Sequence, residues 1–287
     1  MGPLYNMKGR CVRRGVYMRL YVAIPISYAA AHRSSRRAGP VPEAARRQYN
    51  YPMANDMAAR VNAVLDRIET AKEKAGVPTK EITVVAVGKT RPVEDLLSAY
   101  ACGLCHFGEN RIGEAADKAP KLPRDAVLHG VGHIQRYKAK TAAEVFSWIH
   151  SIDKPRTVHA LSRHSGGVGA DRPLNVLIEV NTTGEEAKSG VRDPGEIPAL
   201  AEEISQAEGL RLRGLMTMAP FDPDGDSAAV HRSFATLREL FDKLAPTMPN
   251  DFDTLSMGMS NDFPAAISEG ATMVRIGTAI FGPRDTP

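Results

Sequence analysis

The pattern of apolar positions becomes regular from Met57 onward. Apolar side chains first recur at helical spacing, at Val61, Val64, Leu65 and Ile68, which predicts a helix ending near residues 76–78. The run 82–87, ITVVAV, is then apolar and mostly β-branched without interruption. Such a run is typical of a strand that is buried on both faces of a parallel sheet. A helix followed by a fully buried strand indicates an α/β fold.

The same alternation continues along the chain and predicts eight strands. They cover residues 82–87, 104–107, 126–132, 146–152, 174–180, 210–216, 254–258 and 272–277. Helical patterns join them over residues 92–101, 110–120, 134–144, 154–164, 194–207, 226–245 and 262–269. Strands that alternate with helices pair in parallel through right-handed crossovers, and eight such units in roughly 230 residues predict a single (β/α)8 TIM-type barrel. A doubly wound open sheet is the alternative, but no G-x-G-x-x-G motif follows the first strand.

Composition agrees with a barrel and divides the chain into two parts. The 287 residues are 43% hydrophobic and 24% charged, which suits a large core, and no apolar run is long enough for a membrane span. Residues 1–52 carry ten basic side chains and one acidic one, whereas residues 53–287 carry 27 basic and 32 acidic ones. The body is therefore mildly acidic, which argues against a nucleic-acid-binding role. The three cysteines are too few for a disulfide framework, so we expect a reducing, cytoplasmic location.

The basic segment 1–52 allows four interpretations. Its basic start and the apolar stretch LYVAIPISYAAA resemble a signal peptide, and its many arginines with few acids resemble a transit peptide. A basic arm that contacts nucleic acid or membrane is a third interpretation. We favour the fourth, a disordered extension that precedes a working start at Met53 or Met57. The predicted organisation is therefore an extension over residues 1–52 and one barrel over residues 53–287.

The first predicted strand ends in VGKT, which places Lys89 at the end of the barrel where chemistry collects. A lysine that follows a buried apolar strand is expected to have a buried stem, and desolvation favours its neutral, nucleophilic amine. That is what an imine-forming lysine requires. The alternative is a lysine that turns out to solvent from a loop.

The loops after the last two strands predict a phosphate site at the same end of the barrel. In GMSND, Ser260 offers a hydroxyl group and backbone N–H groups lie beside it; in RIGT, Gly277 and Thr278 offer two more N–H groups. Ser260 as a plain helix N-cap is the alternative. A reactive lysine and a phosphate site that face one cavity fit an aldehyde with a phosphate group, and pyridoxal 5′-phosphate (PLP) is the obvious candidate.

Several longer stretches resemble the pyridoxal-phosphate homeostasis protein family. They are VAVGKT, FGENR, GHIQ, PLNVLIEVN, EEAKSGV, LRLRGLMTMAP and LSMGMSNDFPAAISEGATMVRIGTAIFG, and they run from about residue 60 to residue 284. The resemblance implies a single barrel like the N-terminal domain of alanine racemase. It also implies a PLP-binding protein of intracellular vitamin B6 homeostasis, which stores or delivers the cofactor. One departure is Tyr137 in GHIQRYK, where the family pattern has asparagine, and it leaves the role of the loop from His133 to Lys138 open.

The resemblance further implies a set of site residues. Lys89 carries PLP as an imine, and Arg275 faces the pyridine nitrogen of its ring. The phosphate contacts are Ser260, Gly277 and Thr278, and the remaining cofactor-binding residues are Asn110, Asn181, Met218 and Ser256.

Arg275 favours a carrier over an enzyme. A carboxylate at the pyridine nitrogen would keep it protonated and make the ring a strong electron sink, whereas a guanidinium leaves the ring neutral and the sink weak. A racemase also needs a second base, which in alanine racemases is a tyrosine from a separate β domain, and this chain ends at Pro287. We therefore expect at most a weak racemase-like side activity. A PLP-dependent amino-acid racemase and a cofactor-free lysine-imine aldolase are the alternatives.

The partners follow from the same interpretation. We expect a monomer that binds PLP, contacts PLP-dependent apoenzymes transiently, and binds neither nucleic acid nor membrane.

The stretch ACGLCHFGEN has the Cys-x-x-Cys-His spacing of c-type haem attachment. The pattern places Cys102 at a helix end and Cys105 with His106 in a strand, whereas a haem site needs its histidine on a loop beside a pocket. A zinc site would need further ligands. We interpret both cysteines as small packing residues and expect no metal site. Four other histidines receive no role: His129, His150, His159 and His231.

Overall fold

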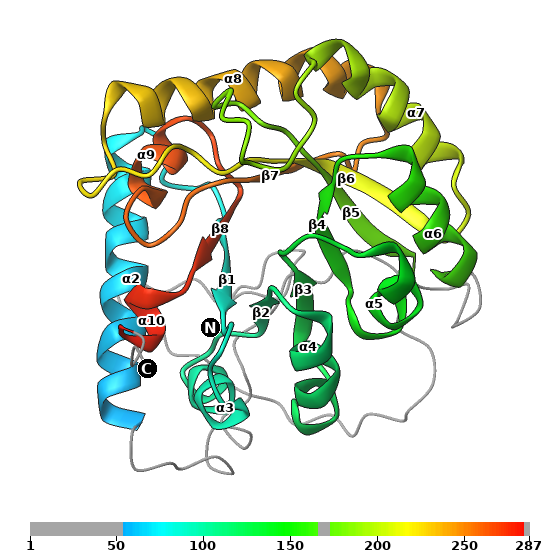
Figure 1. The fold of residues 1–287 in the computed structure, drawn as a ribbon. Coiled ribbons are helices and arrows are strands. Elements are labelled where there is room, and N and C mark those ends of the chain that lie inside the picture. The colour runs from blue at the N-terminus through cyan, green and yellow to red at the C-terminus, as the bar shows by residue number, and fades with distance from the viewer. Residues whose placement is uncertain (1–53, 166–172, 284–287) are drawn as a thin grey trace, which may run out of the picture. The chain divides into compact units, whose positions relative to one another are not determined.

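The computed structural model describes residues 54–165 and 173–283, so the predicted extension 1–52 lies outside the described residues. In the described part of the chain, eight parallel strands close into one barrel in the order of the sequence, with helices around it (Figure 1). The predicted TIM-type barrel is confirmed, and the open sheet is wrong because β1 pairs with β8. None of the described helices is long and apolar enough to cross a membrane.

The elements follow one another as alternating strands and helices. The strands are β1 Thr83–Val87, β2 His106–Glu109, β3 Val127–Gly130, β4 Trp148–Ile152, β5 Leu174–Glu179, β6 Leu210–Met216, β7 Thr254–Ser256 and β8 Met273–Ile276. The α-helices are α2 Ala54–Lys74, α3 Val93–Ala101, α4 Ile112–Lys118, α5 Ala139–Val145, α6 Pro155–Ser165, α7 Ile197–Gln206, α8 Ala228–Leu244, α9 Phe263–Ser268 and α10 Thr278–Phe281. Short 3₁₀ helices cover Ala119–Lys121, Arg136–Lys138, Pro194–Glu196 and Ala245–Thr247.

Several element boundaries differ from the sequence prediction by a few residues, and three differences have a local cause. Strand β2 begins at His106 and not at Leu104, because the chain first returns from α3 through Gly103, whose φ of 101° is left-handed. Cys105 therefore precedes the strand, although its carbonyl already accepts a hydrogen bond from Val127 N at 2.7 Å. The predicted helix 134–144 begins as a 3₁₀ turn and becomes α5 later. Helix α10 has only four residues, too few to show a helical period in the sequence.

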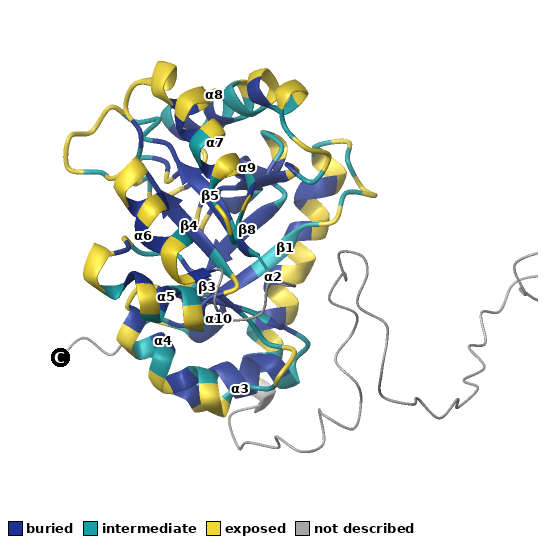
Figure 2. Cartoon of the chain, turned by 90° about the vertical axis from the view of Figure 1, so that its right-hand side faces the viewer, coloured by how far each residue is buried: buried dark blue, intermediate teal, exposed yellow. Residues whose placement is uncertain are grey.

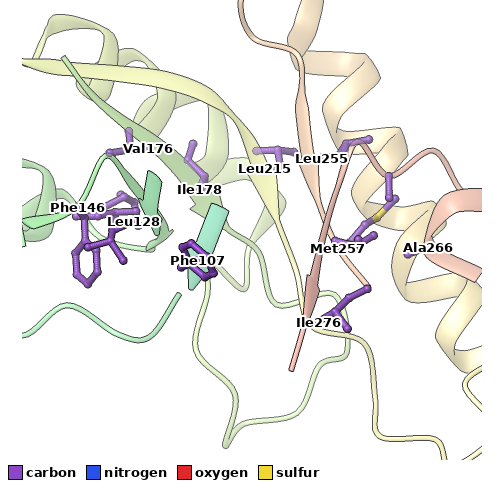
Figure 3. Packing of buried hydrophobic residues seen from close by; sticks show 14 of the residues in the cluster. Phe107, Leu128, Phe146, Val176, Ile178, Leu215, Leu255, Met257, Ala266 and Ile276 are labelled. Carbon is purple, nitrogen blue, oxygen red and sulfur yellow. The ribbon is translucent and has the colours of Figure 1, made fainter. Parts of the chain in front are cut away.

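Successive side chains of each strand point alternately into the barrel and outward toward the helices. Neighbouring strands align apolar residues on one face, as where Phe107 of β2 pairs with Leu128 of β3. Figure 3 shows Leu128 beside Phe146, and Met257 extending toward the position of Ala266 in α9. These outward side chains form the apolar layer between the barrel and its helices, because successive residues of a strand point to opposite faces.

Helix α2 illustrates how the surrounding helices are oriented. Figure 2 shows the strands buried and the outer faces of the helices exposed. Val61, Val64 and Ile68 are buried as predicted, but Leu65 is 38% exposed. The buried stripe follows spacings of three and four residues, so Leu65 falls at its edge. Arg60 Nε donates to the carbonyl of Ile280 at 2.7 Å and ties α2 to α10.

Gly214 of β6 leaves no space for a side chain beside β7, and this yields a stability prediction. Its φ is +153°, and a Cβ there would lie 1.8 Å from the Thr254 carbonyl oxygen of β7. The variant Gly214→Ala should therefore lose about 3 kcal/mol of unfolding free energy in urea titrations, since the backbone itself would have to move. Gly113→Ala in α4 is the matched control, because no atom lies within 4 Å of its Cβ position. That control should be as stable as the parent or more so by up to about 1 kcal/mol. Unchanged stability of Gly214→Ala would contradict the pairing of β6 with β7.

Candidate functional site

A cavity of about 630 Å³ opens at the C-terminal ends of the strands. Its wall comes from the ends of β1, β2, β3, β5, β6, β7 and β8 and from the loops that follow them. The predicted site residues in this wall are Lys89, Asn110, Met218, Ser260, Arg275, Gly277 and Thr278. The volume lies in the range of pockets that enclose a cofactor-sized ligand.

Lys89 follows β1 directly and lies in the cavity wall, half-buried. Among the residues that the structure describes, its ammonium group has no hydrogen bond and no ion pair. An amine without a protein partner is available for a covalent bond with a ligand in the cavity. This placement supports the imine-forming interpretation over a lysine that turns away into solvent.

A buried ion pair supports the residue before Lys89. Lys118 Nζ of α4 donates to Glu109 Oε1 at 2.7 Å and to the Gly88 carbonyl at 3.0 Å. Burial raises the pKa of Glu109, while the hydrogen bond from Lys118 lowers it. Gly88 has no space for a side chain, because a Cβ would lie 2.6 Å from Leu96 Cδ1. A side chain at this position would force the buried Leu96 to move, so packing favours the glycine of VGKT, and the ion pair holds the carbonyl next to Lys89.

The residues after Lys89 are tied to neighbouring segments. Thr90 has a φ of 64°, a conformation that β-branched residues rarely adopt and that costs on the order of 1–3 kcal/mol. Its N–H donates to Glu114 Oε2 at 3.0 Å. Arg91 Nη2 donates to the Gly282 carbonyl at 2.6 Å, beyond α10. Backbone strain of this kind is common at functional sites. Here the two hydrogen bonds hold the strained loop that carries Lys89 in place.

Backbone N–H groups border the cavity at the loops after β7 and β8. In the described chain the N–H groups of Asn261, Gly277 and Thr278 have no acceptor, and all three residues lie in the cavity wall. Ser260 does not cap α9; its hydroxyl accepts a hydrogen bond from Ala279 N at 3.2 Å and so joins the two loops. Unpaired N–H groups beside a glycine are the usual protein contribution to a phosphate site.

Gly277 is not required by the packing of the protein. A Cβ there would meet only the Val87 carbonyl oxygen at 3.4 Å and Val87 Cβ at 3.9 Å, which are ordinary contacts. Its φ of −108° is not left-handed, and its ψ of −81° puts the residue just outside the usual helical region, which adds a small backbone cost for a residue other than glycine. A ligand that approaches the backbone closely would explain the glycine.

Arg275 is buried at 5% exposure at the base of the cavity wall. It donates through Nη1 to Ser256 Oγ at 2.7 Å and through Nη2 to the Thr217 carbonyl at 2.9 Å. Burial lowers the pKa of Arg275 to about 10, while the charges of Asp262 and Glu179 raise it. The guanidinium is therefore charged at neutral pH, and it can donate hydrogen bonds but accept none.

Glu179 is a site residue that the sequence analysis missed. It ends β5, is 4% exposed and lies in the cavity wall. Burial raises the pKa of Glu179 to about 7, the charge of Asp153 raises it further, and Arg275 lowers it. The available signal was an acid inside the apolar run LNVLIEV, two positions before Asn181 and thus on the same face of the strand.

Two predicted site residues lie outside the cavity wall. Asn181 organises the loop after β5, since its Nδ2 donates to the carbonyls of Glu185 at 2.9 Å and Lys188 at 3.2 Å. Ser256 is fully buried and accepts the hydrogen bond from Arg275. Both residues support the cavity, and their direct contact with a cofactor stays a prediction.

The loop from His133 to Lys138, which differs from the family pattern at Tyr137, borders the cavity only through His133. His133 lies in the wall, whereas Tyr137 is 77% exposed and its hydroxyl donates to Gln135 Oε1 at 2.7 Å. The asparagine expected at this position is thus replaced by a side chain outside the cavity wall.

The cysteine motif contributes to the core and not to the cavity. Cys102 is the C-cap of α3, and Cys105 is buried. Burial raises the pKa of the Cys105 thiol, which makes a reactive thiolate less accessible. His106 hydrogen bonds to His129 instead, with Nδ1 and Nε2 2.9 Å apart.

Fold and site define a (β/α)8 barrel in which, within residues 54–165 and 173–283, a lysine after the first strand and N–H groups after the last two strands have no partners. Residues 60–285 match the family model of the alanine racemase N-terminal domain. The pyridoxal phosphate homeostasis protein of Pseudomonas aeruginosa is 44% identical over 232 residues, which are 80% of this chain and 96% of that protein. This chain therefore belongs to the pyridoxal phosphate homeostasis protein family.

Two solved structures have the same fold. PipY of Synechococcus elongatus, solved with PLP bound, is 33% identical with a TM-score of 0.67 and covers 79% of this chain and 100% of that one. A protein of Bifidobacterium adolescentis, described as unknown, is 34% identical with a TM-score of 0.73 and covers 85% of this chain and 98% of that one.

The raised pKa of Glu179 makes the stability of the cofactor-free protein depend on pH. A folded-state value of about 7 against 4.5 for the free group means that folding favours the protonated acid. The stability that Glu179 contributes is fully present below about pH 4.5 and is lost as the pH rises through about 7. Over this range the free energy of unfolding should fall by about 3 kcal/mol. Urea unfolding should therefore show Glu179→Gln gaining on the parent by this amount between about pH 4.5 and about pH 8.

Glu239→Gln is the control, because Glu239 is exposed on α8. Its unfolding free energy should follow that of the parent at every pH. If the curves of Glu179→Gln and the parent also run parallel, the carboxyl group does not have the raised pKa.

Proposed function

We propose that this chain binds PLP in the cavity and acts in vitamin B6 homeostasis as a carrier that stores or delivers the cofactor. The observation that carries the proposal is that one cavity holds two complementary kinds of group. The amine of Lys89 and the N–H groups of Gly277 and Thr278, all without partners among the described residues, lie in the same wall after the adjacent strands β1 and β8. The name of the Pseudomonas relative and the PLP in PipY support the same cofactor.

The amine and the N–H groups suit different parts of the cofactor. When bound, PLP supplies an aldehyde that combines reversibly with amines and a ring that withdraws electrons. Lys89 offers the amine for the covalent bond. The N–H groups at residues 261, 277 and 278 offer hydrogen bonds to the phosphate, and the hydroxyl of Ser260 adds to them.

Arg275 supports a carrier role. Its charged guanidinium can donate a hydrogen bond to the pyridine nitrogen but cannot give that nitrogen a proton at neutral pH, since burial lowers the pKa of Arg275 only to about 10. An unprotonated ring withdraws electrons weakly, so strong carbanion chemistry is disfavoured. The same proposal includes transient contact with PLP-dependent apoenzymes, a monomeric state, a cytoplasmic location and a barrel domain over residues 53–287.

Glu179 favours a second candidate, a PLP-dependent amino-acid racemase. A carboxyl group with a pKa of about 7 in the cavity wall can both accept and donate protons at neutral pH. Steady interconversion of L- and D-amino acids by the PLP-loaded protein, lost in Glu179→Gln, would favour this candidate. Absence of turnover, with cofactor binding retained, supports the carrier.

The covalent bond is tested with Lys89→Ala. The parent protein mixed with PLP should develop an absorbance band of bound cofactor, and borohydride reduction should leave a stable adduct that peptide mass spectrometry locates at Lys89. The variant should show neither. Lys140→Ala removes an exposed lysine of α5 and should behave as the parent. A parent without band or adduct would contradict the proposal and favour the cofactor-free aldolase.

The phosphate site is tested with Gly277→Ala. The added methyl group fits beside Val87, so the unfolding free energy of the cofactor-free protein should fall by no more than about 1 kcal/mol. Affinity for PLP should fall by about tenfold, because the methyl group keeps the phosphate from the backbone. Affinity for pyridoxal, which lacks the phosphate, should fall much less. Equal losses for both ligands would place the phosphate elsewhere.

A further inference from the structure

A continuous chain of hydrogen bonds crosses the interior of the barrel. His106 Nδ1 lies 2.9 Å from His129 Nε2, and His129 Nδ1 lies 2.9 Å from His150 Nε2. His150 Nδ1 lies 3.0 Å from Ser256 Oγ, which accepts the hydrogen bond from Arg275 at 2.7 Å. The five residues belong to β2, β3, β4, β7 and β8. The link from β4 to β7 joins strands that are not neighbours, so it spans the interior.

The donor-to-acceptor direction of these hydrogen bonds follows from their end at Arg275. A guanidinium only donates, so Ser256 must accept from it. The hydroxyl proton of Ser256 then has one acceptor within reach among the described residues, which is His150 Nδ1. His150 therefore carries its proton on Nε2 and donates it to His129 Nδ1. By the same reasoning His129 carries its proton on Nε2 and donates to His106 Nδ1.

Burial keeps the three rings neutral, as this direction requires. It lowers the pKa of His106 to about 4. It also lowers the pKa values of His129 and His150 well below 6.5, and the charge of Arg275 lowers that of His150 further. Three neutral rings with the same tautomer place their acceptor ends toward Arg275. That orientation stabilises a buried guanidinium that has no ion pair among the described residues.

We infer that His106, His129 and His150 are positioning residues, which act through Ser256 to hold the guanidinium of Arg275 in one orientation. The inference rests on the proposed function, because the orientation matters for a ring nitrogen in the cavity. The chain orients and does not conduct protons toward the cavity, since it ends at a group without a lone pair. Ser256, predicted as a cofactor contact, has the role of linking Arg275 to the histidines.

The first test needs no cofactor. Long-range ¹H–¹⁵N correlation spectra of the cofactor-free protein at about pH 7 distinguish the two neutral tautomers of histidine from each other and from the charged ring. The signals are assigned by single histidine variants. His106, His129 and His150 should all be neutral with the proton on Nε2. A proton on Nδ1 of His150, or a charged ring among the three, would overturn the inference whether or not PLP binds.

The second test interrupts the chain of hydrogen bonds at His150 by substitution. Leucine at this position removes the acceptor for Ser256, whereas the Oδ1 of asparagine can still accept its hydroxyl proton. His150→Leu should bind PLP about tenfold more weakly and shift the absorbance band of bound PLP, and His150→Asn should restore most of both. The exposed His159 provides the control, and His159→Leu should match the parent.

Ser256→Ala serves where His150→Leu does not fold, because it removes one hydroxyl group. It should show the same shift of the band and the same loss of affinity. A folded His150→Leu or Ser256→Ala with the band and affinity of the parent would overturn the inference. A parent that binds no PLP would instead contradict the proposed function, and the tautomer spectra would still decide the hydrogen-bond chain.

Discussion

The burial of Arg275 is the constraint on which the site depends. A charged group inside a barrel is costly unless its donors all find acceptors, and Arg275 has no carboxylate partner within the described chain. Ser256 Oγ and the Thr217 carbonyl take two of its hydrogen bonds. These acceptors come from β7 and from the end of β6, the two strands next to β8 on one side of the barrel, and together they fix the guanidinium. The hydroxyl proton of Ser256 in turn needs an acceptor, and His150 provides it. An apolar side chain in place of His150 would leave that proton without a partner.

Closure of the barrel brings the other parts of the site together. Lys89 and Gly277 are separated by most of the chain, but β1 pairs with β8, and Val87 is the nearest neighbour of Gly277. The amine and the N–H groups therefore follow adjacent strands. The buried pair of Glu109 and Lys118 holds the lysine loop at its other side. A cofactor with an aldehyde and a phosphate on one small ring matches an amine and a set of N–H groups in one cavity wall.

The sequence predicted the fold well because strand–helix alternation leaves few topologies open. It also placed Lys89, Ser260, Gly277 and Thr278 at one cavity, since residues that follow parallel strands meet at one end of the barrel, and their contact with a cofactor stays a prediction. It assigned no role to His129 and His150, because their partners lie across the interior and become neighbours only when the barrel closes. Glu179 stands out as an acid inside the apolar run LNVLIEV, but it was missed because its raised pKa depends on burial and on Asp153, which come together only in the fold. The start of β2 was wrong because a left-handed turn at Gly103 delayed the strand.

The central claim of the proposed function is that Arg275 leaves the pyridine nitrogen of bound PLP unprotonated, which favours the proposed carrier over an enzyme. The most direct measurement is the ¹⁵N NMR spectrum of the protein loaded with PLP labelled at the pyridine nitrogen. The account predicts an unprotonated nitrogen that accepts a hydrogen bond, and the signal should move toward that of a free pyridine in Arg275→Leu. A pyridinium signal in the parent protein at neutral pH would contradict the account.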